Sequence, residues 1–190
     1  SMGLALAVHY EVTAEAFDRA AAPDGAPTVE VEVTGAGAGA VPLGEEHLVV
    51  RSLRAGLAHA GVAATVGLRL SCRNAIPHGR GLGSSASAIV VGLRLAQGLL
   101  DDPSSLTDEE LFALATAAEG HPDNASAAQY GGCTLSWVEP GGPRVVQVAV
   151  APAVRAVVCV PDVELATSRA RAMLPQSVPH ADAAFTAGRA

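Results

Sequence analysis

A glycine-rich stretch followed by hydroxyl side chains is the part of the sequence best suited to chemistry. It reads Pro77-His-Gly-Arg-Gly-Leu-Gly-Ser84-Ser85-Ala-Ser87. Glycine adopts positive φ without strain and lets backbone N–H groups approach a ligand, while a helix beginning here would direct its unpaired N–H groups and positive dipole end to the same point. We therefore predict an anion pocket with phosphate as its natural ligand. The residues expected to contact it are Gly79, Gly81, Leu82, Gly83, Ser84 and Ser85.

The apolar residues after this stretch are spaced as in a helix. They recur at intervals of four, three and four positions, which places them on one helix face; they are Ile89, Leu93, Ala96 and Leu100. Ser84 or Ser85 would be a favourable N-cap. Taken alone, the same pattern also fits an ordinary turn with a capped helix. The chain contains no lysine, which excludes the P-loop motif and a Schiff-base lysine of the kind that binds pyridoxal phosphate.

Three segments, in the same order, resemble the GHMP superfamily of small-molecule kinases and, within it, the homoserine kinases. The glycine-rich stretch is similar to the central ATP-binding motif of that superfamily. The run Glu119-Gly-His121-Pro-Asp123-Asn124, followed by residues 131–137, resembles homoserine kinase in particular. The third segment runs from Thr167 to Asp182. Together the three segments extend over nearly the whole chain.

The resemblance implies a fold, a reaction and a set of roles. It implies an α+β fold with a GHMP-kinase N-terminal domain, of the ribosomal protein S5 domain 2-like type, at 1–150, and the beginning of a second, ferredoxin-like domain at 151–190. The implied reaction transfers the γ-phosphoryl group of ATP to the hydroxyl of a small amino acid, with Mg²⁺ held by Ser85 and Glu119. The implied substrate contacts are His121, Asn124, Thr167 and Arg171, and the candidate catalytic residues are His121, Glu119 and Asp123.

Two departures from the family pattern leave a second hypothesis open. The acidic metal ligand is expected two residues before Glu119, where Ala117 stands, and two residues along a helix turn a side chain by about 200°. The family's N-terminal loop and C-terminal glycine-rich motif are also missing. The alternative is a truncated, kinase-derived protein without ATP use, which acts as a ligand-binding or regulatory partner, or as an ATP-independent acid–base enzyme through His121 and Glu119. ATP and Mg²⁺ are doubtful cofactors if the chain is complete.

Composition narrows the classes of partner. The net charge of −7 and the absence of a basic run argue against nucleic acid. No apolar stretch approaches the roughly 20 residues of a membrane span, so we expect no membrane partner and a cytoplasmic location. A small molecule is the expected substrate. Loss of a first strand would expose a sheet edge, which predicts a possible homodimer.

The remaining pattern mixes strands and helices without regular βα alternation, as in α+β folds. Strands are predicted over 4–12, 29–34, 62–72, 134–138, 145–150 and 154–160, with the first two forming an antiparallel pair. Helices are predicted over 50–60, 89–100, 107–119 and 124–130, and from Glu164 and His180 onward. The three isolated cysteines are expected to be buried free thiols; they are Cys72, Cys133 and Cys159. The histidines other than His121 show no metal-cluster spacing and are expected at surface or turn positions.

Overall fold

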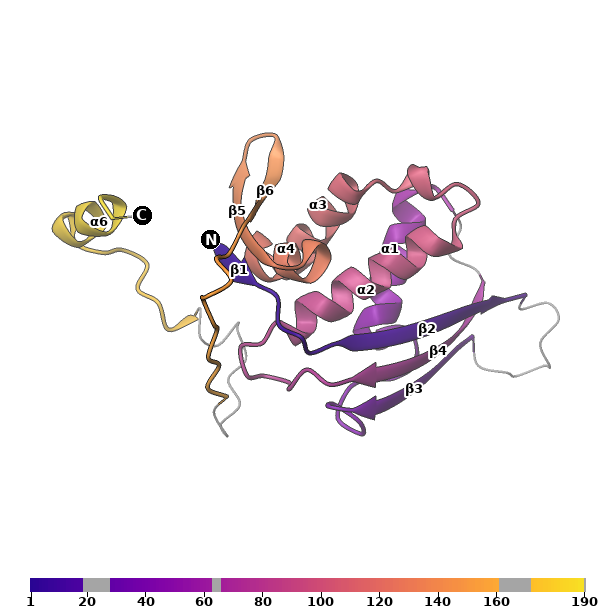
Figure 1. Cartoon of the computed structure of the whole chain (residues 1–190). Helices are drawn as coiled ribbons and strands as arrows, with labels where there is room; N and C mark the ends of the chain where they lie inside the picture. The colour runs from indigo at the N-terminus through magenta and orange to yellow at the C-terminus, as the bar shows by residue number, and fades with distance from the viewer. Residues whose placement is uncertain (19–27, 63–65, 161–171, 190) are drawn as a thin grey trace.

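The larger sheet of the protein has three strands in the order β2-β4-β3. Figure 1 shows the computed structural model of the chain, which describes residues 1–18, 28–62, 66–160 and 172–189. Strand β4 (Gly67–Asn74) lies between β2 (Tyr10–Phe17), to which it is antiparallel, and β3 (Val29–Gly35), to which it is parallel. The predicted antiparallel pair of the first two strands is therefore wrong, because the third strand separates them.

Side chains of β4 alternate between the core and solvent. Leu68, Leu70 and Cys72 are buried, whereas Arg69 and Arg73 lie on the outer face and pair with glutamates of the neighbouring strands. This period of two matches the strand geometry expected when one face of a sheet is solvated. The outer face is thus a charged, solvent-exposed surface, and the inner face is covered by helices.

Two helices cover the inner face, as Figure 1 shows: α1 (Leu48–His59) and α2 (Ser84–Leu99). They approach each other closely at glycines. A Cβ atom added to Gly92 would lie 2.4 Å from the Val49 carbonyl oxygen, and one added to Gly56 would lie 2.6 Å from the Ala96 Cβ. Because these separations are shorter than real Cβ contacts, the two helix axes can approach this closely only with glycine at both positions.

A second helix pair lies beside α2 and leads to the smaller sheet. Helix α3 (Asp108–Glu119) begins with a capping box between Thr107 and Glu110, and α4 (Pro122–Tyr130) follows it after a short turn. The smaller sheet is antiparallel, in the order β1-β5-β6. Its strands are β1 (Met2–Leu4), β5 (Cys133–Glu139) and β6 (Gly142–Val148). Within the described residues lie the short 3₁₀ turns η2 (Gly44–Glu46) and η3 (Pro103–Ser105).

The structure confirms the α+β class and most of the predicted elements, including a helix from His180 (α6, His180–Ala187). Three predictions are wrong in detail. The strand predicted over 4–12 is divided between β1 and β2, the strand predicted from Val62 begins only at Gly67, and residues 154–160 have no regular structure. The helix predicted from Glu164 lies outside the described residues. The division of the chain at residue 150 stays a prediction.

The cysteines and one histidine, His47, also differ from expectation. All three cysteines are free, but only Cys72 is buried, since Cys133 is partly exposed and Cys159 is exposed. His47, at the N-cap position of α1, is buried and not at the surface, and burial lowers its pKa. Among the described residues, no helix is both long and apolar enough to cross a membrane.

Candidate functional site

The glycine-rich stretch forms the loop between β4 and α2. Gly79, Gly81 and Gly83 have φ of 62°, 73° and 71°, in the left-handed region that glycine permits. Gly83 is the N-cap of α2, so the prediction that Ser84 or Ser85 caps the helix is wrong. The left-handed turn at Gly83 starts the helix earlier and makes both serines its first helical residues.

The start of α2 therefore presents unpaired backbone donors. The first intrahelical bond from this end runs from the Ser87 N–H to the Gly83 carbonyl oxygen, at 2.9 Å. The N–H groups of Ser84, Ser85 and Ala86 precede it and have no acceptor within the helix. These donors and the positive end of the helix dipole make the loop suited to an anion.

A carboxylate lies next to the first turn of α2. The Ser85 hydroxyl lies 2.8 and 2.9 Å from the two carboxylate oxygens of Glu119, the last residue of α3. The Glu119 side chain is only 7% exposed. The two-residue shift from the family position therefore does not turn this carboxylate away from the loop, contrary to expectation.

The phase of α3 explains the direction of Glu119. Phe112, Ala115 and Thr116 are buried on the side of α3 that faces the core. Glu119 follows them at seven, four and three positions, so it lies on the same helix face. Ala117 lies on the exposed side. The helix ends at Gly120, whose φ of 83° is the left-handed conformation typical of helix C-termini.

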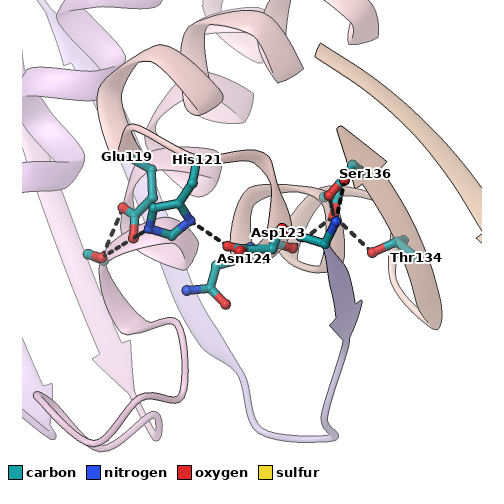
Figure 2. Close-up of polar contacts among 9 residues, drawn as sticks. Glu119, His121, Asp123, Asn124, Thr134 and Ser136 are labelled. Carbon is teal, nitrogen blue, oxygen red and sulfur yellow. Dashed lines mark hydrogen bonds and ion pairs between the residues drawn. The ribbon is translucent and has the colours of Figure 1, made fainter. Parts of the chain in front are cut away.

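His121 lies between two carboxylates, as Figure 2 shows. Its Nδ1 atom is hydrogen-bonded to the Asp123 carboxylate, and its Nε2 atom is 3.8 Å from a Glu119 carboxylate oxygen. Because a carboxylate is an acceptor, the bond to Asp123 assigns a proton to Nδ1. Asp123 also accepts the Asn124 N–H at 2.8 Å. The polar groups thus form a continuous series from Ser85 through Glu119 and His121 to Asp123.

Buried hydroxyl groups hold the turn that carries these residues. The Ser126 hydroxyl donates to the Asp123 carbonyl oxygen at 2.8 Å and lies 2.8 Å from the Thr134 hydroxyl, with Ser136 also within 3.4 Å. All three hydroxyl residues are buried. Strand β1 approaches the same point, since a Cβ atom added to Gly3 would lie 2.6 Å from the Asp123 carbonyl oxygen. Figure 2 shows how β5 and the turn meet here.

A cleft of about 720 Å³ opens beside the loop, and its size suits a small ligand. It is bordered by the loop at Gly81 to Gly83, by Asn124, by the segment from Leu4 to Tyr10, and by Val90 and Arg94 of α2. Leu82 lies in this lining, whereas Ser85 and Glu119 do not. The Asn124 amide adjoins Gly83, where an added Cβ would be 3.5 Å from the amide carbon.

The structure therefore brings most of the predicted site residues together around the start of α2. Two of them, Thr167 and Arg171, lie outside the described residues. No group of three or more His, Cys, Asp or Glu side chains suited to a metal ion occurs in the described part of the chain. A metal at Ser85 and Glu119 would need further oxygen ligands from a substrate or water.

Sequence reasoning missed the polar residues that support the site. Asn74 is buried at the end of β4, and its position continues the even-numbered buried series Leu68, Leu70 and Cys72. That periodicity was a usable signal. The hydroxyl cluster gave a similar signal, because Thr134 and Ser136 alternate along β5 with the outward Leu135.

Comparisons with known proteins show which family the chain resembles. Residues 47–132 match the family described as GHMP kinases N terminal domain. Homoserine kinases from Mycobacterium ulcerans (strain Agy99) and Mycobacterium tuberculosis (strain ATCC 25618 / H37Rv) are 45% and 44% identical over 196 residues, covering 100% of this chain and 60% and 59% of the relatives. The chain thus spans about three fifths of the length of these curated relatives.

A solved structure matches in fold. The homoserine kinase from Cytophaga hutchinsonii ATCC 33406 has a TM-score of 0.71 over 94% of this chain and 55% of its own, at 24% sequence identity. At that identity the match supports the fold alone.

Proposed function

Because the chain contains a GHMP kinase N-terminal domain and so belongs to the GHMP kinase family, we propose that it supplies the phosphate- and metal-binding part of a small-molecule kinase. The proposed reaction transfers the γ-phosphoryl group of ATP to the hydroxyl of a small amino acid. The names of the relatives suggest homoserine as that amino acid. The observation that carries the proposal is the contact between Ser85 and Glu119 at the end of the glycine-rich loop.

The donor set at this contact suits Mg²⁺. This ion prefers oxygen ligands and is commonly bound by one or two protein oxygens together with substrate phosphates and water. Ser85 and Glu119 supply a hydroxyl and a carboxylate, and both are held in place by their helices. When bound, Mg²⁺ would neutralise charge on the phosphates during transfer.

The loop would hold the phosphates through its backbone. The N–H groups of Ser84, Ser85 and Ala86 point out of the start of α2, and the three glycines before them leave room for close approach. A helix terminus is worth about 0.3–1 kcal/mol to a nearby anion, up to about 2 kcal/mol when partly buried. Enzymes lower barriers by about 8 kcal/mol or more, so this loop would position the nucleotide while other groups complete catalysis.

His121 and Asn124 would face the acceptor substrate. The bond from His121 Nδ1 to Asp123 leaves Nε2 as the nitrogen on the Glu119 side, from which the imidazole would accept a proton from the substrate hydroxyl. Asn124 would contact the substrate from the edge of the cleft. We propose Thr167 and Arg171 as further contacts, with the Arg171 guanidinium pairing with the amino-acid carboxylate.

The alternative of a kinase-derived protein without ATP use depended partly on the departure at Ala117. Since Glu119 reaches Ser85, that departure does not separate the carboxylate from the loop, and no observation favours this alternative. The cytoplasmic location and the homodimer stay predictions. Light scattering would test the dimer.

The test uses the full-length protein in an assay of ADP release with ATP, Mg²⁺ and homoserine. A hydrogen bond to a charged group is worth about 1.5–3 kcal/mol, so Ser85→Ala should lower kcat/KM for ATP about 10–100-fold. Ser71→Ala, on the exposed face of β4, is the matched control and should have no effect. ADP release that does not depend on homoserine, or no nucleotide binding by calorimetry, contradicts the proposal.

A further inference from the structure

Asn74 is a buried polar side chain to which the proposed reaction gives no role. It is the last residue of β4 and is 2% exposed. A buried amide must satisfy two donors and one acceptor, and an unpaired one destabilises the fold. Its position is therefore specified by the groups around it.

The side chain contacts the beginning and the end of the glycine-rich loop. Its Oδ1 atom accepts the Ile76 N–H at 2.9 Å, which sets the turn that leaves β4. Its Nδ2 atom lies 3.0 Å from His78 Nε2 and 3.5 Å from the Ser84 hydroxyl. Because the amide nitrogen donates, His78 Nε2 must be the acceptor, and the His78 proton then lies on Nδ1.

The same residue also holds the turn after β3. Nδ2 donates to the Ala36 carbonyl oxygen at 3.2 Å, and the Asn74 carbonyl oxygen accepts the Ala36 N–H at 2.8 Å. The turn is pressed against this point, since an added Cβ on Gly35 would lie 2.2 Å from the Asn74 carbonyl oxygen and one on Gly37 would lie 2.6 Å from His78 Nε2. The turn after β3 therefore packs directly against Asn74 and His78.

Asn74 is therefore the residue at which three segments meet: the turn after β3, the first half of the glycine-rich loop, and the first residue of α2. An amide nitrogen has two hydrogens, which the two shorter contacts, to Ala36 and His78, can take. These bonds fix the loop at its β4 end, as Gly83 fixes it at the α2 end.

We propose that Asn74 is a positioning residue that holds the backbone amides of the glycine-rich loop in their anion-binding arrangement. The proposal rests on the proposed function insofar as the anion is a nucleotide phosphate. Asn74 itself touches no substrate. Its effect on the ligand passes through the conformation of residues 76–86.

The test compares the full-length wild type with Asn74→Asp. The aspartate keeps the acceptor for the Ile76 N–H but places an oxygen against the Ala36 carbonyl oxygen, where the amide donated. The His78 imidazole can change tautomer and donate to the aspartate, so the bond to Ala36 is the one that this variant removes. Thr34→Val is the matched control, because it removes another side-chain bond between β3 and β4, from the Thr34 hydroxyl to the Cys72 carbonyl oxygen at 3.3 Å, without touching the loop. If Asn74→Asp does not fold, His78→Leu is the second variant, because it removes the imidazole that accepts a hydrogen bond from Asn74 Nδ2.

Two measurements separate positioning from general stability. The first is the ¹⁵N order parameter of the amides of residues 79–86, which should be about 0.85 in the wild type and below about 0.6 in Asn74→Asp, with β4 and α1 unchanged. The second is the affinity for Mg-ADP by calorimetry, which should fall at least tenfold while the KM for the amino acid stays within twofold. Thr34→Val should change neither.

Each outcome decides the proposal. Order parameters that are equally high in Asn74→Asp, or already low in the wild type, overturn it, and so does a loosened loop that binds Mg-ADP as tightly as before. A wild type that binds no nucleotide removes the proposed function. In that case the order parameters still show whether Asn74 holds the loop.

Discussion

The Oγ atom of Ser85 lies within hydrogen-bond distance of both carboxylate oxygens of Glu119, so the first turn of α2 meets the last residue of α3. The two residues are 34 positions apart in the sequence. The helices that carry them pack against each other through Ile89, Leu93 and Phe112. The hydroxyl and the carboxylate are therefore placed by the helix packing before any ligand binds.

The first prediction concerns the metal dependence of nucleotide binding. Glu119→Gln should weaken Mg-ADP binding about 10–100-fold, because a charged oxygen ligand is lost, while metal-free ADP should bind no more weakly than to the wild type. Calorimetry with and without Mg²⁺ measures both. Glu109→Gln, at the exposed start of the same helix, is the control. Mg²⁺ enhancement that survives in Glu119→Gln would contradict the proposed role of Glu119 as a metal ligand.

The second prediction concerns the turn into α2. Gly83 has φ of 71°, and an added Cβ would make only ordinary contacts with Asn124, so Gly83→Ala isolates the backbone strain. The free energy of unfolding should fall by roughly 1–2 kcal/mol, measured by urea denaturation. Gly98→Ala, at an exposed position of the same helix with open space around it, should instead raise it by about 0.5–1 kcal/mol. Equal effects of the two changes would refute the left-handed turn.

The third prediction concerns the approach of α1 and α2. Gly92→Ala would place a methyl group 2.4 Å from the Val49 carbonyl oxygen and 2.7 Å from the Ser52 Cβ. The helices must then separate, and overpacking of this kind costs about 1–3 kcal/mol. Thermal unfolding measures the loss, with Gly98→Ala again as the control. A Gly92→Ala variant as stable as the wild type would mean that the helices lie farther apart than described.

The fourth prediction concerns pH and the start of α3. Hydrogen bonds from the Thr107 backbone N–H and hydroxyl, with a further contribution from His59, lower the pKa of Glu110 below its usual value of 4.5. A lowered pKa in the folded state means that the ionised form stabilises the protein above about pH 4.5, and that this stabilisation is lost as the pH falls through the folded-state pKa. The difference in unfolding free energy between the wild type and Glu110→Gln should therefore shrink on acidification. A difference that grows contradicts the assignment.

The hydroxyl of Thr107 provides a separate check on the same cap. Thr107→Ala should lower the free energy of unfolding by about 1 kcal/mol near neutral pH, since it removes the acceptor for the Glu110 N–H. Thr107→Ser keeps the hydroxyl and should cost less. If both substitutions cost the same, the loss comes from the methyl group and not from the cap.

The fifth prediction concerns thiol reactivity. Burial raises the pKa of the Cys72 thiol, and the thiolate is the reactive form. Alkylation of the native protein near neutral pH should therefore modify the exposed Cys159 first, the partly exposed Cys133 more slowly and Cys72 only after unfolding. Mass spectrometry of peptides measures the order, with Cys159→Ser as the control for the fastest phase. Early labelling of Cys72 would show that β4 is not in the core.

Local patterns in the sequence predicted the helices and strands well where a regular spacing of apolar residues defines the buried face of the element. The spacing of Ile89, Leu93 and Ala96 predicted α2, and the alternation of Val29, Val31 and Val33 predicted β3. The pairing of strands could not be predicted in the same way, because alternation gives the buried face of a strand and not its neighbour. The position of β4 between β2 and β3 is set by packing between distant segments.

The positions of the polar groups depend both on local sequence patterns and on contacts between distant segments. The direction of Glu119 follows from the phase of α3, which the buried positions Phe112 and Ala115 define, but comparison with the family position at Ala117 suggested the opposite. Asn74 could be recognised as buried from its place in β4, whereas its partners come from a turn more than 30 residues earlier and a helix ten residues later. Contacts of that kind require the folded chain.

The pairing of β1 with β5 determines when the turn at Asp123 can be completed during protein synthesis. Met2 pairs with Leu135, and Gly3 lies against the Asp123 carbonyl oxygen. At the translation rate of about 5–20 residues per second, Met2 waits roughly 7–27 s for Leu135 to be made. Until then, a nascent chain can form β2, β3, β4 and both of the first two helices, but the turn at Asp123 lacks the strands that complete it.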